Sequence, residues 1–291
     1  MQQIERGIHY EDAFLGVTLG ALTFPHGVIL IDAPLRAEDT RSWRSALINQ
    51  RSGPNRLLIS LDAHPDRTLG TRALDCTIVT HQKAAKVFRN RPTIFKGQNV
   101  QTGADWETYT DAIGMRWAPP DITFTESMSL HWGGPEVVLE HHPGPTPGSI
   151  WVVVPDVHVV FVGDLIVMKQ APFLAFADLE AWQQSLDLLL NTYRNFIIIS
   201  GRGGPVTGED VRHQQKIVKE VSSGLEALAK KNAAPEDTEA LIPGLLSKCN
   251  VPSDLRERHK QRLRYGLYHC YMRRFRATGL IVQAESEDEE Q

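Results

Sequence analysis

The segment Leu57–Gly70, LLISLDAHPDRTLG, decides how the rest of the sequence is interpreted. Its apolar start has the pattern of a buried strand. A loop dense in charge follows, with Asp62, His64, Asp66 and Arg67 within six residues. Loops at the ends of buried strands are where rigid scaffolds present reactive side chains. We therefore expect this loop to lie at a functional site, or at what is left of one.

The composition is that of an ordinary soluble globular protein. The 291 residues permit one large domain, or one domain with an appendage. Hydrophobic residues make up 42% and charged residues 23%, and a net charge of −4 is too small to indicate a polyanion as partner. The three cysteines are scattered without a CxxC pair, which favours a reducing compartment. The sequence shows no signal peptide and no apolar run that could span a membrane, so we expect a cytoplasmic protein without a membrane partner.

Apolar runs and helical periodicity predict two β-rich halves, each with helices. In the first half, the run before Asp32 predicts a buried strand that delivers a carboxylate at its end. The predicted strands are 13–19, 21–24, 27–31, 57–59 and 76–80, and then 122–130, 136–140, 150–154, 158–162 and 195–200. The predicted helices are 37–50, 69–75, 82–89 and 181–192.

After residue 208 the pattern changes to helices, predicted at 209–231, 240–249 and 253–276. The last residues, 285–291, are mostly acidic and are predicted to be disordered. The expected division is a β-rich domain at 1–206, a helical extension at 207–284 and an acidic tail at 285–291.

Four segments at predicted strand ends carry the chemical side chains. They are DAHPDR (62–67), HPGPTPGS (142–149), FVGD (161–164) and SGRGGP (200–205). In order, spacing and flanking strands, residues 13–206 resemble the metallo-β-lactamase superfamily. The resemblance implies an α/β (α+β) fold, a four-layer αββα sandwich, here with a C-terminal helical appendage.

The family's metal motifs are only partly present. His64 and Asp66 match the second histidine and the aspartate of HxHxDH, and Asp164 matches the bridging aspartate of the GD motif. In the family, the histidines of these motifs hold zinc, iron or manganese, and a bridging hydroxide is the nucleophile. Four of those histidines are replaced here, by Asp62, Arg67, Pro145 and Arg202.

The replacements argue against a metal. Proline has no side-chain donor, and arginine is permanently cationic and offers no lone pair. Buried carboxylates need a cationic partner. We therefore predict that Arg67 and Arg202 fill the pocket in place of metal and pair with Asp66, Asp164 and Asp62, with no cofactor bound.

The competing interpretation keeps at most one weakly bound divalent ion, Mg²⁺, Mn²⁺ or Zn²⁺. In that case Asp66 and Asp164 would act on the attacking water. The candidate ligands are Asp62, His64, Asp66 and Asp164, with His142 as a stand-in.

Three functions remain open from the sequence. The first is a catalytically degenerate hydrolase homologue that binds an unknown small molecule or a protein partner, or serves as a subunit, with a homodimer as one form. The second is a residual metal-dependent hydrolase of esters, thioesters or phosphodiesters. The third is a nucleic-acid-binding module through the basic helix 256–276. Nucleic acid is not the expected partner, because aromatic residues at helical spacing in that segment predict a packing face.

Overall fold

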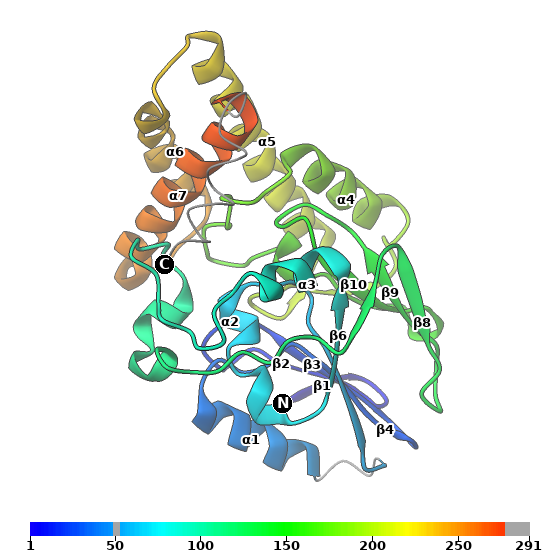
Figure 1. The fold of residues 1–291 in the computed structure, drawn as a ribbon. Coiled ribbons are helices and arrows are strands. Elements are labelled where there is room, and N and C mark those ends of the chain that lie inside the picture. The colour runs from blue at the N-terminus through cyan, green and yellow to red at the C-terminus, as the bar shows by residue number, and fades with distance from the viewer. Residues whose placement is uncertain (49–52, 277–291) are drawn as a thin grey trace.

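Two β-sheets face each other and carry helices on both outer sides (Figure 1). The structure, a computed structural model, describes residues 1–48 and 53–276. The predicted four-layer αββα sandwich is confirmed. The first sheet has the order β1-β2-β3-β4-β5-β6-β7, and the second has the order β13-β12-β11-β10-β9-β8.

Strands β1 to β4 form an antiparallel meander, and β5, β6 and β7 then add in parallel. The second sheet is antiparallel except for the parallel pair β11 and β12. The bounds of the first sheet are β1 (Gln2–Glu5), β2 (Ile8–Glu11), β3 (Leu19–Phe24), β4 (Gly27–Ile31), β5 (Asn55–Ile59), β6 (Thr77–His81) and β7 (Ile122–Phe124). Those of the second are β8 (Ser127–Leu130), β9 (Val137–His141), β10 (Ile150–Val154), β11 (Val159–Phe161), β12 (Ile197–Ile199) and β13 (Pro205–Val206).

Seven α-helices accompany the sheets in the described ranges. They are α1 (Ala37–Ile48), α2 (Pro65–Thr68), α3 (Gln82–Arg89), α4 (Leu179–Asn191), α5 (Gly208–Lys230), α6 (Ile242–Lys248) and α7 (Arg256–Tyr271). A 3₁₀ turn at Asp105–Thr108 and another at Pro235–Leu241 matter below.

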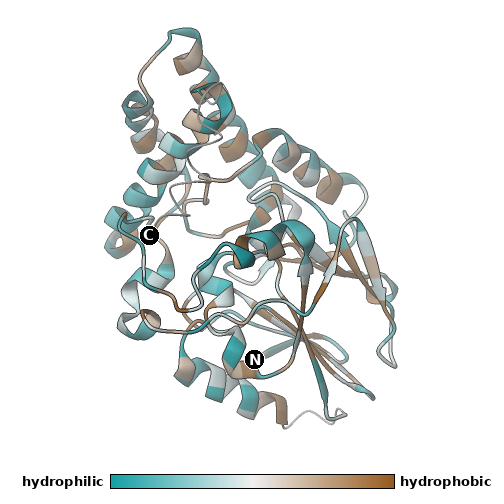
Figure 2. Cartoon of the chain, in the orientation of Figure 1, coloured by the Kyte–Doolittle hydropathy of each residue, from teal (hydrophilic) through white to brown (hydrophobic). Residues whose placement is uncertain are grey.

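Side-chain alternation along each strand sorts the apolar residues into layers. In β4, Ile29 and Ile31 point to the second sheet, whereas Val28 and Leu30 pack under α1 with Trp43. The same alternation places some side chains of β10 between the two sheets and the others beneath α4. Figure 2 shows the strands as mainly hydrophobic and the exposed helix faces as hydrophilic.

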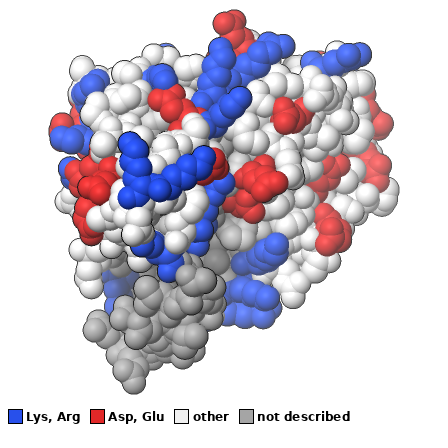
Figure 3. Space-filling model, turned by 90° about the horizontal axis from the view of Figure 1, so that it is seen from above, with Lys and Arg blue, Asp and Glu red and all other residues white. Residues whose placement is uncertain are grey.

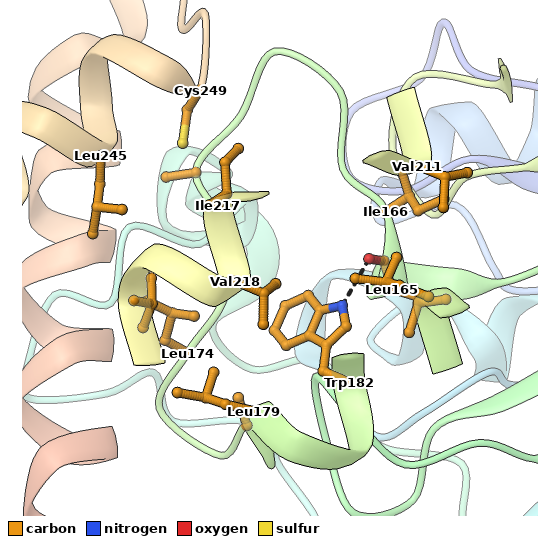
Figure 4. Packing of buried hydrophobic residues seen from close by; sticks show 14 of the residues in the cluster. Leu165, Ile166, Leu174, Leu179, Trp182, Val211, Ile217, Val218, Leu245 and Cys249 are labelled. Atoms are coloured by element: carbon orange, nitrogen blue, oxygen red, sulfur yellow. Dashed lines mark hydrogen bonds between the residues drawn. The ribbon is translucent and has the colours of Figure 1, made fainter. Parts of the chain in front are cut away.

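The helical extension shares a core with the β-sandwich. Trp182 of α4 packs against Val218 of α5, and its Nε1 donates to the carbonyl of Leu165 at 2.9 Å (Figure 4). Leu263 and Leu267 of α7 belong to the same apolar cluster. The predicted domain boundary near residue 206 stays a prediction, and the predicted acidic tail, 285–291, lies outside the described residues.

Two of the predicted strands are wrong. Residues 13–18 form a loop and Leu19 begins β3, because Gly16 has φ of +109° and its carbonyl accepts from Arg202 Nη1. Residues 122–130 form two strands in different sheets, since β7 pairs with β6 and β8 pairs with β9. Strands β1 and β2, in the first eleven residues, were not predicted.

The sandwich gathers several strand ends in one place. The residues just beyond β4, β5, β11 and β12 lie together, as shown by backbone hydrogen bonds from Asp32 to Ile59 and from Gly201 to Gly163. These ends carry the predicted site residues. No helix of the described residues is long and apolar enough to cross a membrane.

Candidate functional site

Arg67 lies at the centre of a buried ionic cluster. It belongs to α2, the short helix that follows the β5 loop, and its guanidinium contacts Asp32, Asp62 and Asp164. The Nε–Asp62 distance is 2.8 Å and the Nη2–Asp164 distance is 2.6 Å. The Arg67 side chain has no exposed surface. A single cation therefore holds three carboxylates that come from three different strand ends.

Arg202 approaches the same cluster from the loop after β12. Its Nε lies 3.2 Å from Asp164 Oδ1, and its Nη1 lies 3.0 Å from Asp66 and 2.6 Å from Asp105. Asp164 is thus shared between the two arginines. Arg202 also donates to the Gly16 carbonyl at 3.1 Å, which ties the β2–β3 loop to the cluster.

Asp66 is fully occupied by donors. Its Oδ1 accepts from the backbone N–H of Trp106 at 2.8 Å, and its Oδ2 accepts from the N–H of Asp105 at 3.1 Å. These are the first amides of the 3₁₀ turn Asp105–Thr108, so Asp66 caps that turn. With Arg202 as a third partner, this carboxylate has little capacity left for a metal.

Asp32 is the most unusual carboxylate of the cluster. It is a non-glycine residue at φ of +58°, held there because its Oδ1 accepts from Leu61 N–H at 3.0 Å while its Oδ2 contacts Arg67. Burial raises the pKa of Asp32 to about 7, against the lowering effect of Arg67.

The opposite shift occurs at Asp164. Burial alone would raise the pKa of Asp164, but the charges of Arg202 and Arg67 outweigh it and hold that pKa well below its usual range. Asp164 is therefore a stable carboxylate, and Asp32 is the member of the cluster that can carry a proton near neutral pH.

The C-terminal helix α7 supplies two more cations. Arg258 Nη2 lies 3.2 Å from Asp105 Oδ1, and Arg262 Nη2 lies 3.7 Å from the same oxygen. Arg262 Nη2 also donates to the Gly103 carbonyl. A side chain at residue 103 would collide with α7, because the position of its Cβ would be 2.5 Å from the Arg258 carbonyl oxygen. Loop 101–105 and α7 therefore lock each other at the rim of the cluster.

The ring of Phe173 joins the groups at this rim. The Arg262 guanidinium carbon lies 3.9 Å from the ring centre and that of Arg202 lies 4.8 Å from it. The His64 ring packs 4.3 Å from the same ring. Five carboxylates, of Asp32, Asp62, Asp66, Asp105 and Asp164, thus meet four guanidinium groups.

The comparisons with known proteins agree with this architecture. Residues 69–200 match the family model of the metallo-beta-lactamase superfamily. The fold is that of the metallo-β-lactamase superfamily. The resemblance inferred from the strand-end motifs is thereby confirmed. A comparison with curated protein sequences finds no match.

Solved metallo-β-lactamase-fold structures superpose on most of the chain at low identity. The stereoselective inverting sec-alkylsulfatase Pisa1 from Pseudomonas sp. is 14% identical with a TM-score of 0.64, and the match covers 94% of this chain and 49% of Pisa1. The chain thus spans about half the length of that enzyme. The metallo-beta-lactamase from Pontibacter korlensis is 17% identical with a TM-score of 0.59, and the match covers 75% of this chain and 97% of that protein. The metallo-beta-lactamase IND-7 is 18% identical with a TM-score of 0.58, and the match covers 75% of this chain and 96% of IND-7.

The metals of the metallo-β-lactamase family do not fit this site as it is arranged. Among residues 1–48 and 53–276, no three His, Cys, Asp or Glu side chains converge as a ligand set. Asp62 Oδ1 already accepts from the His64 N–H at 2.8 Å, and His64 Nδ1 accepts from the Asp66 N–H at 3.2 Å. A divalent ion between Asp62 and Asp164 would also meet the permanent charge of Arg67.

His64 is the retained histidine of the motif, and it caps α2. Burial, together with the charge of Arg202, lowers the pKa of His64 to about 3. The ring is therefore neutral at physiological pH. Its tautomer follows from the Asp66 contact, because Nδ1 accepts and Nε2 consequently carries the hydrogen.

His142, the predicted stand-in ligand, has other partners. Its ring stacks on Trp151 at 3.8 Å, and its Nε2 lies 2.9 Å from Glu140. Its side chain therefore packs with the outer layer of the second sheet and does not join the four other candidates. Ser149 of the same loop bonds Thr146 through its hydroxyl, which is a structural role.

Three members of the cluster escaped sequence reasoning. Asp105 lies in the segment 90–120, where periodicity is absent, and no local pattern marks it. Arg258 and Arg262 were assigned to the basic helix 256–276 without a link to the site. Asp32 was visible as a carboxylate at the end of a buried strand, but its partner Arg67 could not be inferred from that position.

Proposed function

We propose that this chain is a catalytically degenerate metallo-β-lactamase-fold protein that acts through binding or as a subunit. The observation that carries the proposal is the placement of Arg67 and Arg202 against Asp164, the residue that matches the family's bridging aspartate. Both guanidinium groups are buried, and each contacts carboxylates on several sides. They stand where positive metal charge would be expected, so the pocket keeps its electrostatic balance without a metal.

The retained acidic residues support the same conclusion. A nucleophilic mechanism needs a water held by a metal or by a free base. Asp66 is used as a cap for the turn Asp105–Thr108, and Asp164 is neutralised by two arginines. Neither carboxylate is left to activate water.

The basic helix offers little support for nucleic-acid binding. Arg264 pairs with Glu239, Arg274 pairs with Glu226, and Arg262 is buried. Figure 3, which views the helical end of the molecule, shows Lys and Arg side chains interspersed with Asp and Glu rather than in one continuous basic surface. Protein or small-molecule binding is therefore the form of the proposal we favour.

The proposal is tested by metal analysis of protein purified without added metal, combined with assays on ester, thioester, phosphodiester and sulfate-ester substrates. We expect less than about 0.1 equivalent of zinc, iron or manganese, and no turnover above the background rate when Zn²⁺ or Mn²⁺ is added. One stoichiometric ion together with chelator-sensitive turnover would instead establish the residual hydrolase.

A gain-of-ligand variant separates loss of ligands from closure of the pocket. It carries Asp62→His, Arg67→His, Pro145→His and Arg202→His, and its control carries Pro145→His alone. Tight binding of metal by the fourfold variant, and none by the control, would show that the arginines exclude the ion. If neither variant binds metal, the pocket has also changed its shape.

A further inference from the structure

A groove runs along the exposed side of α7. Two adjoining cavities, of about 370 and 260 Å³, share Gln261 and Arg264 and together form it. We call it the α7 groove, and define it by the residues that line these two cavities. Its two ends differ in chemistry.

The end of the α7 groove near the start of the helix is basic and polar. Arg258, Lys260 and Arg264 line it. Glu107 and Glu257 line it too, but the two oxygens of Glu107 accept from Thr102 and Gly103. Arg258 and Arg264 already pair with Asp105 and Glu239. Lys260 lies 3.6 Å from Glu257 in an exposed and therefore weak pair, so Lys260 is the cation that an acidic segment would meet here.

The other end of the groove is mainly apolar. Val100, Tyr265 and Tyr268 line it, and Glu239 there is neutralised by Arg264. Val100 is 56% exposed, although aromatic side chains lie beside it. This hollow therefore offers an apolar contact surface to a segment with apolar side chains.

We propose that residues 280–290 of this same chain bind in the α7 groove. The chain continues from the last described residue, Arg276, through an apolar stretch that includes Leu280, Ile281 and Val282, and then an acidic stretch, ESEDEEQ, at 285–291. A segment that turns back along α7 meets the apolar end of the groove first and the basic end second. The segment is apolar first and acidic second, which matches the order in which it meets the two ends of the groove.

The lengths agree with this path. α7 continues into a π-helical turn, Met272–Arg276, and the α-helical rise places Tyr268 at most about 12 Å and Lys260 at most about 24 Å before Arg276. An extended chain of about 3.3 Å per residue brings Val282 up to about 20 Å and Glu285 up to about 30 Å from Arg276. The apolar residues therefore reach the tyrosines, and the acidic residues reach Lys260 and Arg258 with length to spare for the turn.

Binding of this segment would make the groove a self-occupied surface. An acidic, partly apolar peptide of a partner would have to displace it, because both use the same two ends. A partner that recognises α7 would then need enough affinity to displace the C-terminal residues.

The test compares hydrogen exchange in the full-length wild type and in a full-length variant, Leu280→Ser/Ile281→Ser/Val282→Ser. We expect backbone amides of residues 100–108 to exchange about fivefold faster or more in the variant, whereas those of the β-sheets are unchanged. Ile113→Ser, an exposed apolar position outside the groove, is the matched control. A synthetic peptide of residues 277–291, added to the variant, should restore the protection.

The basic end is tested separately. Lys260→Glu should raise exchange of the same amides, and 0.5 M NaCl should reduce the difference from the wild type. Lys216→Glu, exposed on α5, is the control. Equal exchange in the wild type and the triple variant would overturn the proposal, as would peptide binding that is equally tight to both proteins. Peptide binding that ignores Lys260→Glu would overturn the assignment of the acidic residues to this end.

Discussion

The arginine–aspartate cluster and the apolar core beneath α4 are both buried, but they are stable for opposite reasons. Transfer of each apolar side chain out of water is favourable, so residues such as Leu186 and Trp182 stabilise the core individually. Transfer of each charge of the ionic cluster out of water is unfavourable, and only its pairing with opposite charges offsets this cost. Arg67 and Arg202 are as buried as Trp182. The difference is that no member of the cluster is stable without its partners.

Under the proposed function, this contrast would explain how a metal site can be lost without loss of the fold. Side-chain charge from α2 and from the loop after β12 would then take the place of the metal charge, and α7 contributes further cations at the rim through Arg258 and Arg262. The sandwich and its strand ends stay in place because the layers between and around the sheets remain apolar. The scaffold and the site are therefore separable in energetic terms.

The largest effect should come from removing the central cation. Arg67→Met is expected to lower the free energy of unfolding by about 3–5 kcal/mol, because Asp32, Asp62 and Asp164 lose a shared partner while buried. Urea denaturation at pH 7 measures it. The control Arg41→Met, at an exposed position of α1, should change stability by less than about 0.5 kcal/mol.

A second substitution sharpens this result. Asp62→Asn removes one of the uncompensated charges, and the asparagine side-chain oxygen can still accept from the His64 N–H. In the double variant with Arg67→Met, we expect recovery of about 1–2 kcal/mol relative to strict additivity. Additive losses would show that Arg67 stabilises the fold through packing rather than through charge.

The apolar core should respond differently to conservative change. Leu186→Ala is expected to cost about 2–5 kcal/mol, but Leu186→Met less than about 1.5 kcal/mol, since the volume is kept. Arg67→Lys keeps the charge, yet an ammonium cannot reproduce the fork that spans three carboxylates. We expect Arg67→Lys to cost more than Leu186→Met in the same urea experiment, and the reverse order would contradict the comparison.

The same contrast decides what the sequence can predict. Apolar periodicity predicted most strands and two β-rich halves, and the four-layer sandwich followed from the resemblance of the four strand-end motifs to the metallo-β-lactamase superfamily. The Arg67 and Arg202 positions followed from the motif replacements. Asp105 could not be found, because its role depends on a turn capped by Asp66 and on α7, which are distant in sequence. The loop at 13–18 was predicted as a strand because the contact of Gly16 with Arg202 is likewise non-local.

The pH dependence of stability should reveal the buried neutral histidines. Burial lowers the pKa of His64 to about 3, and it lowers the pKa of His259, which lies beside Arg262 and Arg258, to about 2. In the unfolded chain both titrate near 6.5, so the unfolded state gains protons first as the pH falls below about 6.5. Stability from these residues is therefore complete above that pH and decreases by up to about 1.4 kcal/mol per pH unit for each histidine down to the folded pKa values.

The titration of Asp32 opposes part of this dependence of stability on pH. Its folded pKa of about 7 exceeds that of a free carboxyl, so between pH 7 and about 4 the folded state binds its proton first, which stabilises the fold as the pH falls. In that pH range the Asp32 proton therefore offsets the contribution of one of these two histidines. His259→Phe should lower the overall stability but flatten the slope, as measured by urea denaturation at pH 7, 6 and 5. An unchanged slope would mean that His259 becomes protonated in the folded protein.

The smallest effect should come from an ion pair of the same chemistry at the surface. Arg274 lies 2.7 Å from Glu226, and the two side chains are 35% and 43% exposed. Solvent screens such a pair, so Arg274→Ala should cost less than about 1 kcal/mol, and a double-mutant cycle with Glu226→Ala should give a coupling of about 0.2–1 kcal/mol. The corresponding cycle for the buried pair Arg202 and Asp105, measured under the same conditions, should give a larger coupling because neither charge can be satisfied by water. If the two couplings were equal, the strength of the cluster would depend on the chemistry of the pair alone, and burial could not be the reason that these arginines hold the buried aspartates together.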